Sequence, residues 1–68
     1  MKNQEEINNL VNIAMHHVEY ALQSVEEAQI LATDSKYLFD LFNSVFSNLA
    51  GAKYYLSIAN NITESVSV

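Results

Sequence analysis

Residues 25–42 read VEEAQILATDSKYLFDLF, and the fold depends on what happens in the middle of this stretch. Its central residues, Ala32-Thr33-Asp34-Ser35, separate two apolar patterns. Thr, Asp and Ser are poor in helix interiors but good at helix N-caps, because their side-chain oxygens accept hydrogen bonds from the free N–H groups of the first turn. We therefore place a turn here, with Asp34 or Ser35 as the N-cap of a second helix.

The first apolar pattern precedes this turn and recurs at alternating steps of four and three residues. It consists of Ile7, Val11, Ala14, Val18, Ala21, Val25, Ala28 and Ala32. Residues at this spacing share one face of an α-helix, and the positions opposite them are nearly all polar. We letter the heptad with Val11 at position a and Ala14 at position d. The spacing predicts a helix over residues 4–32.

The second apolar pattern follows the turn with the same alternating steps. It consists of Leu38, Phe42, Val45, Leu49, Ala52, Leu56 and Ala59. The chain contains no proline and a single glycine, so little interrupts a long helix. The pattern predicts a helix over residues 36–60, while residues 61–68 lose it and are expected to fray.

The two patterns fit each other when the chain is folded back so that the numbers of facing residues sum to 70. Ala21 then faces Leu49, and five of the six a-to-d layers contain an alanine. Facing a small side chain with a larger one fills space without voids. The sequence therefore predicts an all-α, coiled-coil-like antiparallel hairpin that forms one domain over residues 1–60. A single continuous helix is the weaker alternative, because it would leave both patterns without a partner.

The chain is short for an independent fold, with 68 residues and no cysteine. Such chains rarely bury enough apolar surface alone, and oligomerisation is the usual remedy when disulfides are absent. Large side chains also flank the two patterns, where a hairpin has no third layer to cover them. We expect a second copy to cover them in a homodimeric four-helix bundle, through Leu10, Met15, Leu22, Phe39, Phe46 and Tyr55.

Residues with catalytic or metal-binding chemistry are few. His16 and His17 are the only histidines, and Glu19 lies three residues after His16. A metal site needs three or four ligands, but the second helix offers only Asp40. No glycine-rich loop, nucleophile–base pair or pair of carboxylates is visible. We expect no catalytic residue, no cofactor and no metal, and hence no enzyme.

In size and topology the chain resembles the dimerisation domains of sensor histidine kinases, which are two-helix hairpins that pair into four-helix bundles. That resemblance implies a phosphotransfer role for His16 or His17. In that family an acidic residue directly follows the phosphorylated histidine, and a basic, proline-containing stretch comes next. Residues 16–22 read HHVEYAL and lack both features. Histidine phosphotransfer or metal binding is therefore the least favoured of our hypotheses.

The charge of the chain narrows the range of partners. Its net charge is −5, with three lysines and no arginine, which argues against direct binding of nucleic acid. No apolar stretch approaches the length of a membrane span, and the N-terminus does not read as a signal peptide. We expect a cytoplasmic protein without membrane contact.

Two hypotheses for function remain ahead of phosphotransfer. The first is a small, non-catalytic homodimeric module for protein–protein interaction or regulation. The second is an acidic inhibitor of a nucleic-acid-binding protein. Both assign the contact with another protein to the outer face of the hairpin, for which the candidate residues are Glu19, Glu26 and Tyr54.

Overall fold

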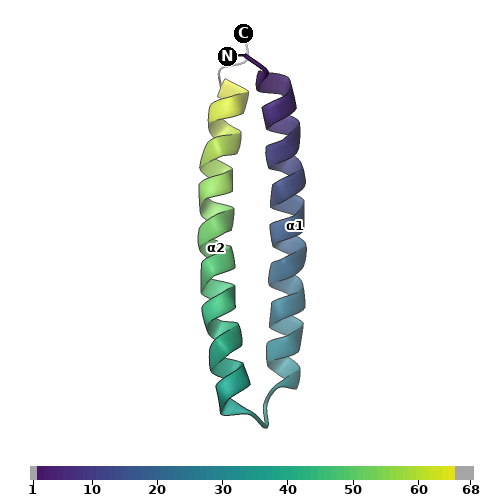
Figure 1. The fold of residues 1–68 in the computed structure, drawn as a ribbon, viewed down its shortest axis with the longest axis vertical. Helices are drawn as coiled ribbons and strands as arrows, with labels where there is room; N and C mark the ends of the chain where they lie inside the picture. The colour runs from purple at the N-terminus through teal and green to yellow at the C-terminus, as the bar shows by residue number, and fades with distance from the viewer. Residues whose placement is uncertain (1, 66–68) are drawn as a thin grey trace.

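The structure, a computed structural model, describes residues 2–65 and contains two helices, α1 (Gln4–Leu31) and α2 (Lys36–Ser65). Figure 1 shows the helices side by side and antiparallel, joined by a short connection at one end. The molecule is a rod of 53 × 14 × 13 Å. The predicted antiparallel helical hairpin is confirmed.

The turn forms where the cap chemistry predicts it. The backbone N–H of Ala32 donates to the carbonyl oxygens of Ala28 (3.0 Å) and Gln29 (3.2 Å), which closes α1. Ser35 is the N-cap of α2, because its Oγ accepts a hydrogen bond from the N–H of Leu38 at 3.3 Å. Ala32 has φ −91° and ψ 41°, so α1 ends here without a residue in the left-handed conformation that favours glycine.

The second helix runs further than the sequence pattern suggests. It continues to Ser65, so residues 61–65 are helical and the predicted end at residue 60 was wrong. Residues 66–68 lie outside the described residues. The prediction ended α2 too early because of Thr63. This polar residue takes the inward heptad position seven residues after Leu56 and is buried there. A search for apolar residues at inward positions does not detect a buried polar residue.

Hydrogen bonds between the helices define their register. At the open end, Thr63 Oγ1 donates to Asn8 Oδ1 at 2.6 Å, and Gln4 Nε2 donates to the carbonyl oxygen of Thr63. Near the turn, Gln29 Nε2 donates to Asn43 Oδ1 at 2.6 Å and to the carbonyl oxygen of Phe39 at 3.5 Å. The numbers of the bonded residues sum to between 67 and 72, on both sides of the predicted 70.

The buried face of α1 is rotated from the predicted one. The a positions and the d alanines are at least half-buried as expected, but so are the e positions, which are Asn8, Met15, Leu22 and Gln29. Ile7, Leu38 and Val45 were predicted to be core and are instead exposed. The alanines at the d positions of α1 are too short to fill the space between the helices, whereas the longer Met15 and Leu22 reach it. These two side chains therefore lie partly inside their own hairpin.

Candidate interaction surfaces

The hairpin has almost no interior, so its surface is where function must be sought. Of residues 2–65, only Ala32 and Thr63 are buried, and sixteen large apolar side chains are exposed. So many exposed apolar side chains are typical of an interaction surface and are unusual for a protein that is stable as a monomer.

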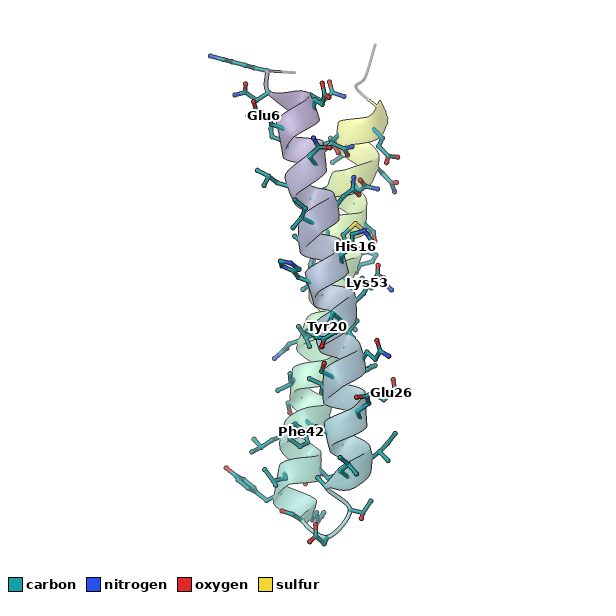
Figure 2. The ribbon with its side chains drawn as sticks, turned by 90° about the vertical axis from the view of Figure 1, so that its right-hand side faces the viewer. Glu6, His16, Tyr20, Glu26, Phe42 and Lys53 are labelled. Carbon is teal, nitrogen blue, oxygen red and sulfur yellow. The ribbon has the colours of Figure 1, made fainter. Side chains whose placement is uncertain are left out.

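The heptad positions divide this surface into two sides. On α2 the letters start from Phe42 at position a, the inward position. The hydrogen bond from Gln29, at e of α1, to Asn43, at b of α2, shows that the e and b flanks of both helices lie on one side. Figure 2, with α1 in front, shows Glu26 and Lys53 toward the same edge of the hairpin. The c and g flanks of both helices therefore lie on the opposite side, and the d positions lie between these flanks and the contact of the two helices.

The c, d and g positions make up what we call the charge-poor side. Twelve of the sixteen exposed large apolar residues lie on it: Ile7, Leu10, Ile13, Tyr20, Leu31, Tyr37, Leu38, Leu41, Val45, Tyr55, Ile58 and Ile62. Its only charged residues are Glu6 and Glu27, both on α1. Between Lys36 and Ser65, α2 contributes no charge to it.

The b and e positions make up the opposite side, which we call the glutamate side. It carries six charged residues: Glu5, Glu19, Glu26, Lys36, Lys53 and Glu64. Its large apolar residues are Met15 and Leu22, which are half-buried, and Phe39 and Phe46, which are 39% and 37% exposed. This side is thus a short apolar strip bordered by charges.

The six residues predicted for the dimer interface do not form one surface. Leu10 and Tyr55 lie on the charge-poor side, whereas the other four lie on the glutamate side: Met15, Leu22, Phe39 and Phe46. They were predicted as one group because all six flank the seam, which is the line of inward-facing a and d residues along which the two helices meet. The antiparallel arrangement instead sends the e and g flanks to opposite sides.

The three residues predicted for the partner face also divide. Glu19 and Glu26 are exposed and lie seven residues apart on the glutamate side. Tyr54 lies at an outer f position of α2, and its ring packs edge-on against Tyr55, with centroids 5.4 Å apart and planes at 68°. The two tyrosines therefore form one aromatic ridge, although they were predicted to belong to different surfaces.

Several exposed apolar residues were missed altogether. Ile13 and Tyr20 face outward at c positions of α1, and Figure 2 shows Tyr20 on the side of α1 away from α2. A signal for them is present in the sequence, because Leu10, Ile13, His17 and Tyr20 recur at steps of three, four and three. These residues form a second apolar pattern on α1, which is shorter than the one at the a and d positions and contains a histidine.

Within the described residues, the two histidines have no neighbouring side chains that could complete a metal site. His16 and His17 are both exposed. Across residues 2–65, no group of three or more His, Asp or Glu side chains is placed to hold a metal ion. Neither α1 nor α2 is long and apolar enough to cross a membrane.

Comparisons with protein-family models, with curated proteins and with solved structures found no match.

Proposed function

We propose that the protein is a small, non-catalytic, homodimeric helical module that mediates protein–protein interaction. The observation that supports this function is the amount of surface that the hairpin leaves exposed. Its accessible surface is 5183 Å², whereas a compact monomer of 7.7 kDa exposes about 4,300 Å². Sixteen large apolar side chains are part of this exposed surface, and the hairpin has no third layer to cover them.

The division into two sides supports a module that binds more than its own copy. A second hairpin packed on one side leaves the other side free for a different protein. On the glutamate side, Glu19 and Glu26 stand beside an apolar strip, and Lys2 is the only lysine before Lys36. Such a surface suits a partner with a basic, amphipathic helix, because opposite charges speed encounter and fix orientation. A nucleic-acid-binding protein is one source of such a helix, which keeps the acidic-inhibitor hypothesis as the second candidate.

Sedimentation equilibrium at micromolar concentrations tests the homodimer. We expect a particle of twice 7.7 kDa. We also expect a melting temperature that rises with protein concentration, because unfolding is then coupled to dissociation. A folded monomer of 7.7 kDa under these conditions would overturn the proposal.

Binding of a synthetic Leu/Lys amphipathic peptide, followed by fluorescence anisotropy, tests the glutamate side. Replacing Glu19 and Glu26 together by Gln should weaken binding by about 2- to 30-fold, as two exposed ion pairs predict, and added salt should have the same effect. The matched control replaces Glu6 and Glu27 by Gln, with the same helix and the same change in charge but on the other side. Equal weakening by both pairs would show non-specific attraction and remove the glutamate side as a binding site.

A further inference from the structure

We infer that two copies pair through the charge-poor side, with α1 of each copy against α2 of the other. The inference rests on the proposed homodimer and names its interface. The glutamate side then lies on the outside of the resulting four-helix bundle, which also excludes Met15, Leu22, Phe39 and Phe46 from the contact between copies.

The distribution of charge favours the charge-poor side over the glutamate side. Pairing through the charge-poor side withdraws from water the eight exposed apolar side chains of each chain that lie at d and g positions, and it places only Glu6 and Glu27, at c positions, on the border of the contact. Pairing through the glutamate side would cover two exposed phenylalanines and bring in six charged residues per chain. Removing charges from water costs more than imperfect pairing returns, so the first arrangement is strongly preferred.

The area that a compact dimer of this chain would bury meets the need of a stable dimer. Two separate hairpins expose twice 5183 Å². A compact protein of twice 7.7 kDa exposes about 7,200 Å², so a bundle of ordinary compactness hides about 3,200 Å² in total. Obligate homodimers bury about 2,000–5,000 Å², whereas weak contacts bury less than about 1,200 Å².

The location of the two glutamates selects the orientation. Both belong to α1, and α2 contributes no charge to the charge-poor side. Packing α1 against α2 of the other copy places Glu6 and Glu27 beside uncharged residues, whereas packing α1 against α1 brings the glutamates of the two copies together. The favoured arrangement has its two-fold axis along the rod. All neighbouring helices are then antiparallel, and both turns lie at the same end.

Two matched double variants test the interface. Leu10→Glu with Tyr55→Glu adds two carboxylates to the charge-poor side, at residues that are 66% and 70% exposed in the hairpin. Ile30→Glu with Ser47→Glu adds the same charge to the same helices at outer f positions, where both residues are exposed. We expect the first pair to raise the dimer dissociation constant by about 100-fold or more and the control pair to change it by about threefold at most.

Sedimentation of the wild type beside these variants separates the possible failures. A monomeric wild type would overturn the proposed homodimer itself. A dimeric wild type that the control pair weakens as much as, or more than, the Leu10 and Tyr55 pair would leave the homodimer standing and overturn this interface.

A distance measurement on the folded dimer tests the orientation and does not depend on how the glutamate variants fold. The chain has no cysteine, so Thr33→Cys in the exposed turn introduces a single position for a spin label. With both turns at one end, the two labels should lie within less than half of the 53 Å length of the rod. A separation close to that full length would place the turns at opposite ends and overturn the pairing of α1 with α2.

Discussion

Replacing Thr63 by valine tests whether the polar contact at the open end holds the two helices in register. Thr63 is only 5% exposed. Its Oγ1 donates to Asn8 Oδ1 at 2.6 Å and lies 3.0 Å from the carbonyl oxygen of Asn60, while its own carbonyl oxygen accepts from Gln4 Nε2. Valine keeps the shape and branching of threonine, so Thr63→Val removes the hydroxyl and leaves the packing in place.

The loss of stability expected for Thr63→Val follows from the burial of the groups that lose a hydrogen-bond partner. A buried acceptor left without a donor costs about 1–3 kcal/mol, and the half-buried Asn8 places this case at about 1–2 kcal/mol. The 64 described residues correspond to an unfolding entropy of about 130 cal/mol/K, or about 7 °C of melting temperature per kcal/mol. We therefore expect Thr63→Val to lower the melting temperature by about 7–15 °C.

Thermal unfolding followed by circular dichroism, at one fixed protein concentration, is the appropriate assay. A double-mutant cycle with Asn8→Ala isolates the contact, and the two changes should be coupled by about 0.5–1.5 kcal/mol. Ser44→Ala is the control, because the Ser44 hydroxyl bonds only within α2, to the carbonyl oxygen of Asp40 at 3.3 Å. If the coupling of Thr63 and Asn8 is below about 0.3 kcal/mol, the contact does not hold the register.

Two further substitutions probe the seam and the single glycine. Ala21→Leu should overpack the half-buried seam opposite Leu49 and lower the free energy of unfolding by about 1–3 kcal/mol in urea denaturation, and unchanged stability would place Ala21 outside the seam. Gly51→Ala should raise the free energy of unfolding by about 0.5–1 kcal/mol, because no heavy atom lies within 4 Å of an added Cβ and the glycine has no positive φ. A dimer weakened by Gly51→Ala would instead show that another chain approaches the backbone closely at that point.

The local features of this protein follow from the sequence alone. The steps of four and three determine two helices, since residues at that spacing lie on one face whatever surrounds them. Ser35 determines the start of α2 through a bond to its own first turn. The register also follows to within a few residues, because the residue numbers joined by hydrogen bonds between the helices sum to between 67 and 72, on both sides of the predicted 70.

The division of the surface was decided by the tertiary structure. The sequence shows that Met15, Phe46, Leu10 and Tyr55 all lie beside the seam, but it does not show that the first two face one side and the last two face the other. That outcome depends on the antiparallel packing and on the rotation of α1 about its own axis. The rotation is set by how side chains of both helices fill the space between them, which is a property of volumes that meet only after the chain has folded.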